Sequence, residues 1–274
     1  MKIFISSDME GTAGVVDWEQ VLASGPRYEY YCELLLNEVN AAILGAADAG
    51  ATEFLVNDSH SKMANLRLDA LEGHARYLSG RLKPWYMMQG LDSSFDAIFF
   101  VSYHGSMGSA GSNLSHTYFP SAFAEVTING VVAGESGINA LVAQAFGVPI
   151  VLITGDETTA RELAPFAPTA LSAVVKTSVT RFAADSLHPD DACQLIREQA
   201  RRAVASLESM QKVSLSLPIH LRMSFRTSDY TELACRVAGV TRVGTLAADI
   251  VGDDPLEIFR TFITVVLLCR GFVE

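Results

Sequence analysis

Hydrophobic residues in the first half of the chain fall into short, nearly unbroken runs. Four runs are rich in Ile, Val and Phe: residues 2–6 (KIFIS), 53–57 (EFLVN), 97–103 (AIFFVSY) and 149–155 (PIVLITG). Because polar residues do not alternate with hydrophobic ones in them, such runs are typical of strands buried on both faces, as in a parallel sheet. We therefore expect four inner strands.

Helical patterns lie between these runs. Residues 28–49 place Leu34, Leu35, Val39, Ile43 and Ala46 on one recurrent face, and Gly50 follows as a helix C-cap. A second helix is expected from about Ile138 to Phe146. Strands that alternate with helices predict an α/β fold in which helices cover a mostly parallel sheet.

The pattern changes later in the chain. Residues 125–134 alternate around Asn129-Gly130 and predict a β-hairpin. After about Ser186, an amphipathic helix (Pro189 to about Met210) leads to an alternating strand, IHLRMSF, and to a last helix from about Pro255. We interpret residues 1–186 as an α/β domain that carries the catalytic site, and residues 187–274 as a smaller α+β region packed on it.

Composition narrows the classes of function. The 274 residues are 49% hydrophobic, and the net charge of −11 argues against nucleic acid or an anionic membrane surface as the main partner. No signal peptide is recognisable, and the apolar run FITVVLLC from Phe262 is too short to cross a bilayer. Scattered cysteines without a CxxC pair suit a reducing cytoplasm: Cys32, Cys193, Cys235 and Cys269.

Acids and histidines follow three of the predicted strands. Asp8 and Glu10 come after the first strand, Asp58 and His60 after the second, and His104 after the third. Turn or capping chemistry would explain any one of these positions. The carboxyl ends of parallel strands meet at one edge of a sheet, where ligands bind, so three such positions together indicate a site.

Two further residues could join this edge. Glu135 lies between the hairpin and the next helix, where the helix dipole also favours an acid. His116 follows a glycine-rich segment, residues 105–112, which lacks the Lys-Ser/Thr of a Walker loop and is expected to be mobile. A catalytic zinc takes three protein ligands and keeps one position open for water, so five ligands are too many for one such site. Five carboxylates and imidazoles suit two metals about 3.5–4 Å apart, bridged by a carboxylate. The five are Asp8, Glu10, His60, His104 and Glu135. Zinc, manganese, iron and cobalt all accept such ligands.

The sequence resembles the DppA-type D-aminopeptidases, a family of dinuclear zinc metallopeptidases, over nearly its whole length. The shared motifs are SDMEGTAGV (7–15), VNDSHSKMANL (56–66), SYHG (102–105), LSHT (114–117) and GESGINA (134–140). The resemblance implies two zinc ions held by Asp8 as the bridge and by Glu10, His60, His104 and Glu135. It also implies that His116 is the catalytic histidine.

This resemblance implies a cytosolic aminopeptidase that removes the N-terminal residue of short peptides, with D-amino-acid peptides as substrates. Two metal ions would activate a shared water, and His116 would give a proton to the leaving amine. A homo-oligomer of ten subunits in two pentameric rings is implied as well. The segment GSMGSAGSN (105–113) departs from the family pattern and leaves the substrate preference open.

Two other functions stay open at this point. Another dinuclear hydrolase, such as a phosphoesterase or an amidohydrolase, could use the same metal pair. A phosphate substrate favours cationic side chains near the site, and Lys62 is the only one close to the ligand motifs in sequence. A non-enzymatic assembly protein with structural metal would normally close the site with four ligands, usually including cysteine.

The remaining polar candidates receive structural interpretations or stay open. Asp58 is expected to orient a metal-bound histidine, and Asp156 to cap a helix. Lys176 and Arg181 could contact the substrate or a neighbouring subunit. Surface or strand positions are expected for His74 and His220, whereas His188 precedes a helix that Asp190 or Asp191 is expected to cap. A serine triad is not supported, because no GxSxG elbow is present and Ser115 is merely adjacent to His116.

Overall fold

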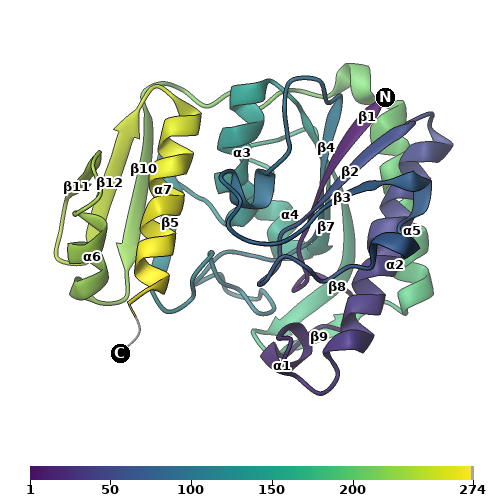
Figure 1. The fold of residues 1–274 in the computed structure, drawn as a ribbon, viewed down its shortest axis with the longest axis horizontal. Coiled ribbons are helices and arrows are strands. Elements are labelled where there is room, and N and C mark those ends of the chain that lie inside the picture. The colour runs from purple at the N-terminus through teal and green to yellow at the C-terminus, as the bar shows by residue number, and fades with distance from the viewer. Residues whose placement is uncertain (273–274) are drawn as a thin grey trace.

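The computed structural model describes residues 1–272 and contains two β-sheets with their helices (Figure 1). The larger sheet has seven strands, in the spatial order β3 (Arg76–Leu78), β2 (Glu53–Asp58), β1 (Lys2–Ser7), β4 (Ala97–Tyr103), β7 (Ile150–Asp156), β8 (Leu171–Thr180) and β9 (Ala183–Ser186). All neighbouring strands are parallel except β8 and β9. The predicted α/β fold with a mostly parallel sheet is confirmed, and all four predicted strands are present.

Both faces of this sheet are buried, which explains the unbroken hydrophobic runs. In β1, Ile3 and Ile5 belong to one core, whereas Phe4 belongs to the other. The first core lies under α2 (Tyr28–Asp48) and α5 (Pro189–Ala205). The second lies between the sheet and the helices α3 (Glu135–Phe146), α4 (Glu157–Leu163) and α7 (Pro255–Arg270).

The smaller sheet is antiparallel and continues the second core. Its order is β11 (Val240–Arg242), β12 (Ala247–Gly252), β10 (Ile219–Phe225), β5 (Phe123–Ile128) and β6 (Val131–Val132). Strands β5 and β6 form the predicted hairpin, and its turn residues Asn129 and Gly130 have the expected positive φ angles of 50° and 80°. Helices α6 (Ser228–Ala234) and α7 pack against this sheet.

Elements from each side of the proposed boundary at residue 186 pack against elements from the other side. Helix α5 packs on α2, where Arg197 donates to Asp48 at 2.7 Å, and the hairpin β5–β6 pairs with β10. The two-part division therefore stays a prediction. The amphipathic helix also ends earlier than expected, at Ala205, and a 3₁₀ turn, η4 (Leu207–Ser209), follows it.

Short elements complete the chain and border the site. They are α1 (Trp18–Val21) and the 3₁₀ turns η1 (Leu68–Ala70), η2 (Glu72–His74) and η3 (Tyr86–Met88). Within residues 1–272, no helix combines the length and the apolar character that a membrane crossing requires.

Candidate metal centre

The predicted ligands meet where the strand order of the large sheet reverses. Strand β1 lies between β2 and β4, so the chain builds outward from β1 in both directions. In such sheets the crevice beyond the carboxyl ends of the central strands is the position where ligands bind. Asp8 directly follows β1, and His104 directly follows β4. His60 follows β2 after one residue, which brings it to the same edge.

The loop after β1 is held down at several points. The Gly11 amide donates to the Ser102 carbonyl at 2.8 Å, and a Cβ at Gly11 would lie 2.0 Å from the Tyr103 carbonyl oxygen. Only glycine allows this approach, which accounts for the glycine of the DMEG motif. The buried Lys176 ammonium donates to the carbonyls of Glu10 (2.5 Å) and Val15 (2.7 Å). These contacts fix the backbone from which Asp8 and Glu10 project.

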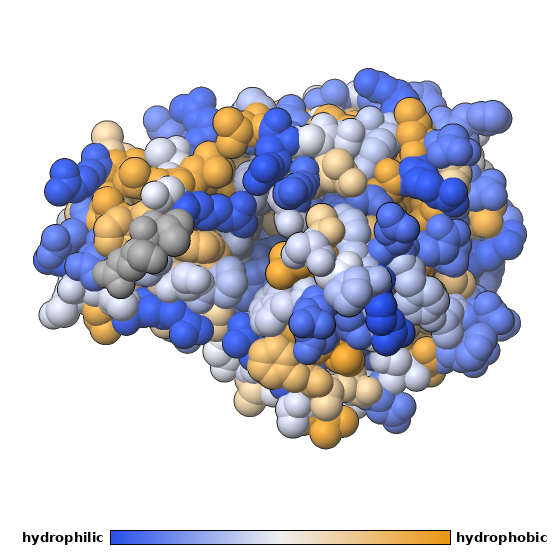
Figure 2. All heavy atoms as spheres, turned by 60° about the horizontal axis from the view of Figure 1, so that its bottom comes forward, coloured by the Kyte–Doolittle hydropathy of each residue, from blue (hydrophilic) through white to orange (hydrophobic). Residues whose placement is uncertain are grey.

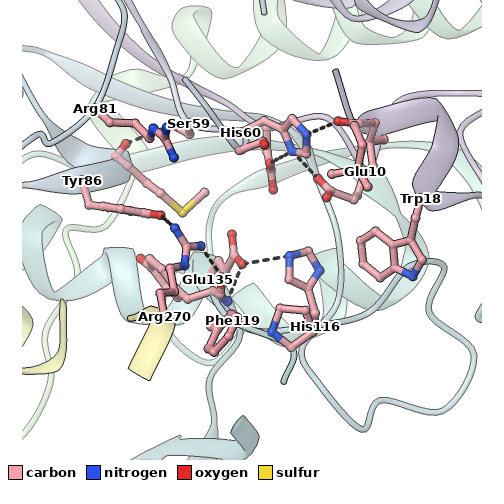
Figure 3. Close-up of a pocket in the computed structure, with 17 residues that line it drawn as sticks. Glu10, Trp18, Ser59, His60, Arg81, Tyr86, His116, Phe119, Glu135 and Arg270 are labelled. Atoms are coloured by element: carbon pink, nitrogen blue, oxygen red, sulfur yellow. Dashed lines mark hydrogen bonds and ion pairs between the residues drawn. The ribbon is translucent and has the colours of Figure 1, made fainter. Parts of the chain in front are cut away.

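All six predicted site residues converge in one cluster, of which Figure 3 shows Glu10, His60, His116 and Glu135. His60 Nδ1 lies 3.0 Å from Glu10 Oε2 and 3.5 Å from Asp8 Oδ1. His104 Nε2 lies 3.3 Å from Asp8 Oδ2 and 3.8 Å from Glu135 Oε1. His116 Nε2 lies 3.7 Å from the same Glu135 oxygen, and its ring stacks on that of His104 with centroids 4.1 Å apart.

In each imidazole, one ring nitrogen is within hydrogen-bond distance of a backbone carbonyl oxygen, and the other ring nitrogen faces the carboxylates of the cluster. His60 Nε2 contacts the Val21 oxygen at 2.7 Å, and His104 Nδ1 contacts the Gly105 oxygen at 2.9 Å. His116 Nδ1 contacts the Leu114 oxygen at 2.9 Å. Because a carbonyl accepts only, the N–H is on that nitrogen in each neutral ring, and the lone pair faces the carboxylates. Metal-bound histidines are oriented in this way.

The unsatisfied atoms of the cluster fit a metal. Asp8 Oδ2 and His104 Nε2 are buried and make no hydrogen bond, although they are 3.3 Å apart. Buried polar atoms without a partner are costly, and a coordinated cation would satisfy both. Two groups have ligand atoms within 4.8 Å of one another: Asp8 with Glu10 and His104, and His104 with His116 and Glu135. This mixture of imidazole and carboxylate suits zinc and similar divalent ions.

Burial and neighbouring charges shift the pKa values of Asp8, His104 and Glu135 in different directions. Burial would raise the pKa of Asp8, but His104 and His60 outweigh it and hold that pKa far below its usual range. Burial would lower the pKa of His104, but Asp8 and Glu135 raise it to about 10. Burial raises the pKa of Glu135 to about 7, although His104 opposes the shift.

His116 differs from the other two histidines. Burial and the positive charge of His104 lower the pKa of His116 to about 4, so its ring is neutral near pH 7. A neutral ring with a free Nε2 has to accept a proton before it can give one. The ring also lies edge-on to Trp18 of α1, with centroids 5.4 Å apart.

The Asp58 carboxylate does not orient His60, contrary to the sequence prediction. It accepts from the backbone amide of Asn65 and from the Tyr77 hydroxyl, both at 2.6 Å. The Asn65 side chain in turn donates to the His60 carbonyl at 2.9 Å. Asp58 therefore stabilises the loop that carries His60, and the Val21 carbonyl orients the imidazole.

The other polar candidates have structural contacts. Asp156 caps α4 by accepting from the Thr159 amide at 2.8 Å, which confirms its predicted role. Arg181 donates to the Ser115 carbonyl at 2.9 Å and so holds the segment before His116. Three histidines lie outside the cluster: His74 in η2, His188 at the N-cap of α5, and His220 in β10 beside Asp249. His188 itself caps α5 by accepting from the Asp190 amide at 3.2 Å, so the predicted cap by an aspartate was wrong.

A pocket of about 450 Å³ opens from the cluster. On the face in Figure 2, the surface is hollowed between the part that carries α7 and the part that carries the large sheet. Several lining residues had no sequence signal: Trp18, Arg81, Tyr86, Phe119 and Arg270. Arg270, the last residue of α7, donates to the Tyr86 hydroxyl and to the Tyr118 carbonyl (2.5 Å). Lys62, the cation close to the motifs in sequence, is exposed and does not line the pocket.

A buried cluster of carboxylates and imidazoles that opens into such a pocket is typical of a metal-dependent hydrolase. The sequence model of peptidase family M55, described as D-aminopeptidase, matches residues 1–264. The D-aminopeptidase of Bacillus subtilis (strain 168) is 32% identical over 265 residues, which cover 96% of each chain. The solved structure of the Zn-dependent D-aminopeptidase DppA from Bacillus subtilis, a self-compartmentalizing protease, matches with a TM-score of 0.95 and 30% identity over 100% of both chains.

The chain belongs to this D-aminopeptidase family, as its motifs indicated. It is a metal-dependent aminopeptidase, so the alternative of a non-enzymatic assembly protein falls away.

Proposed function

We propose that the enzyme removes N-terminal D-amino-acid residues from short peptides at a centre of two zinc ions. The observation that carries this proposal is the arrangement of Asp8. Its Oδ1 faces His60 at 3.5 Å, and its Oδ2 faces His104 at 3.3 Å. A carboxylate whose two oxygens face different imidazoles is placed to bridge two ions.

The remaining donors divide between the two oxygens of Asp8. Glu10 lies beside His60 at 3.0 Å, and Glu135 lies beside His104 at 3.8 Å. Zinc is the metal of the solved relative, and the absence of thiolates from this cluster is compatible with a hydrolytic zinc centre. When bound, the two ions would supply a water of lowered pKa and polarise the scissile carbonyl.

His116 is the residue of this chain that would move protons. Its Nδ1 stays on the Leu114 carbonyl, so Nε2 is the atom that accepts a proton and passes it to the leaving amine. The ring keeps its position between His104 and Trp18. His116 also has ligand spacing to His104 and Glu135, and the metal content of His116→Ala distinguishes a proton carrier from a ligand.

Metal content and a substrate panel test the proposal. Purified protein should hold close to two zinc equivalents per chain by elemental analysis, and chelation should abolish activity that added zinc restores. D-aminoacyl peptides should be cleaved in preference to L-aminoacyl peptides and to phosphoesters in the same assay. At most one ion under saturating zinc would overturn the two-metal centre. A preference for L-peptides would overturn the proposed substrate class.

We also propose that the enzyme is a cytoplasmic homo-oligomer that encloses its active sites, with ten subunits in two pentameric rings. The solved relative is a self-compartmentalizing protease of the same fold. The cysteines Cys32, Cys193, Cys235 and Cys269 are free, which fits a reducing compartment. Light scattering should give about ten times the 29.5 kDa of one chain. A fully active monomer would contradict the assembly.

A further inference from the structure

The pocket beside the metal centre has two sides of different charge. In Figure 3, Glu10, His116 and Trp18 lie on one side, whereas Arg81, Tyr86 and Arg270 lie on the other. We call the second group the arginine side. Glu135 lies between the two. Bound cations would neutralise the carboxylates of the first side, but they would not neutralise the arginines.

Neither arginine is paired with a carboxylate within residues 1–272. Arg67, Arg197, Arg201 and Arg222 each form an ion pair at the surface. Arg81 makes no hydrogen bond or ion pair in this part of the chain, and its side chain is exposed while it lines the pocket. Its guanidinium therefore has all its donors available for an anion.

Arg270 is a fixed cation rather than a free one. It donates to the Tyr86 hydroxyl and to the Tyr118 carbonyl, and its guanidinium lies over the Tyr86 ring, 5.5 Å from the centroid. Both partners are neutral, so the charge of Arg270 persists in the pocket. Arg270 also lies beyond residues 1–264, which the family model matches.

We propose that Arg81, supported by the charge of Arg270, binds the C-terminal carboxylate of the substrate. The enzyme would then select di- and tripeptides with a free C-terminus over amidated ones. This inference rests on the proposed peptidase function, which places the N-terminal end of the peptide at the metal cluster. A residue spans about 3.3–3.6 Å, so the carboxylate of so short a peptide stays within the pocket. The pocket volume of about 450 Å³ is in the usual range for small ligands.

The test compares peptides with their C-terminal amides. Zinc-loaded wild type should cleave D-Ala-D-Ala and D-Ala-Gly-Gly with kcat/KM about 10-fold above that of the matching amides, as expected for a charge-assisted contact at a solvent-accessible site. The preference should reside in KM and should shrink at high salt. Arg81→Gln should reduce it to below about 3-fold, whereas Arg81→Lys should retain part of it.

Arg67→Gln is the matched control, because Arg67 is a surface arginine 3.4 Å from Glu33 and away from the metal pocket. It should leave the peptide-to-amide ratio unchanged. Binding gives a readout that does not need turnover. In the zinc-loaded His116→Ala variant, calorimetry should show about 10-fold tighter binding of D-Ala-D-Ala than of its amide. Adding Arg81→Gln should abolish this difference.

The outcomes separate this inference from the proposed function. Equal kcat/KM for peptides and amides, or a ratio that Arg81→Gln does not change, would overturn the carboxylate site while leaving the peptidase intact. If the zinc-loaded protein cleaved none of the four compounds, the proposed function would fail, and the calorimetric comparison would still decide the role of Arg81. A changed particle mass in Arg81→Gln would assign Arg81 to a subunit contact and would also overturn the inference.

Discussion

Glu38 offers a prediction whose sign and size follow from its surroundings. It lies on α2 with 2% of its surface exposed, beneath the loop that carries the metal ligands. Its carboxylate accepts from the Ala13 amide at 2.8 Å and from the Ser102 hydroxyl at 2.6 Å. Burial raises the pKa of Glu38 from 4.5 to about 7, and these two donors and Lys176 offset the shift only in part.

The raised pKa means that the folded chain binds this proton more tightly than the unfolded chain does. The contribution of Glu38 to stability is therefore present below pH 4.5 and is lost as the pH rises through about 7. With these two pKa values, the loss between about pH 5 and pH 8.5 amounts to about 2.5 kcal/mol. Glutamine has the shape of the protonated acid, and it can accept from Ala13 and donate to Ser102.

Urea unfolding of wild type and Glu38→Gln, at one protein concentration with chelator present, measures this effect. The stability of the variant relative to the wild type should increase by about 2.5 kcal/mol from pH 5 to pH 8.5. Glu33→Gln, on the exposed part of the same helix, should show no comparable trend. A difference that is independent of pH, or one that falls as the pH rises, would refute the argument that burial keeps Glu38 protonated.

Three further substitutions test the metal centre and its support. His116→Ala should keep both metals and lower kcat by about 10²–10⁴-fold, whereas His104→Ala should lose metal as well as activity; elemental analysis and kinetics of each variant distinguish the two. Metal loss in His116→Ala would instead make that residue a ligand. Lys176→Met removes the donor to three buried oxygens and should cost about 3 kcal/mol in urea unfolding, whereas Lys212→Met, at an exposed position, should cost less than about 0.5 kcal/mol.

The convergence of Asp8, Glu10, His60 and His104 could be predicted because a parallel sheet gathers the carboxyl ends of its strands at one edge, whereas Glu135 and His116 follow none of these strands and were indicated by the family motifs. Asp8, His60 and His104 each follow a run that is hydrophobic on both faces, so the strand ends were recognisable in the sequence. The same logic did not extend to the antiparallel sheet. Its hairpin was recognisable, but its partner β10 comes about ninety residues later, and such long-range pairing has no local signature.

The arginine side of the pocket could not be predicted for a similar reason. Arg81 lies in an irregular segment. Arg270 is the last residue of a helix, and its hydrogen-bond partner Tyr86 is 184 residues away in the sequence. Neither residue belongs to a motif or to a hydrophobic period. The orientation of the His60 ring could not be predicted from the sequence either. The Val21 carbonyl that holds it is a backbone group, which every residue type provides.

The position of Arg270 bears on how the protein is made in the laboratory. Because Arg270 lines the pocket, an affinity tag placed directly after α7 would begin close to the pocket. The N-terminus lies at the opposite end of β1 from Asp8, at the amino edge of the large sheet (Figure 1). An N-terminal tag would keep the pocket clear, and a polyhistidine tag directly after α7 would bring additional metal ligands near the metal centre. Metal stoichiometry should therefore be measured on protein from which any C-terminal tag has been removed.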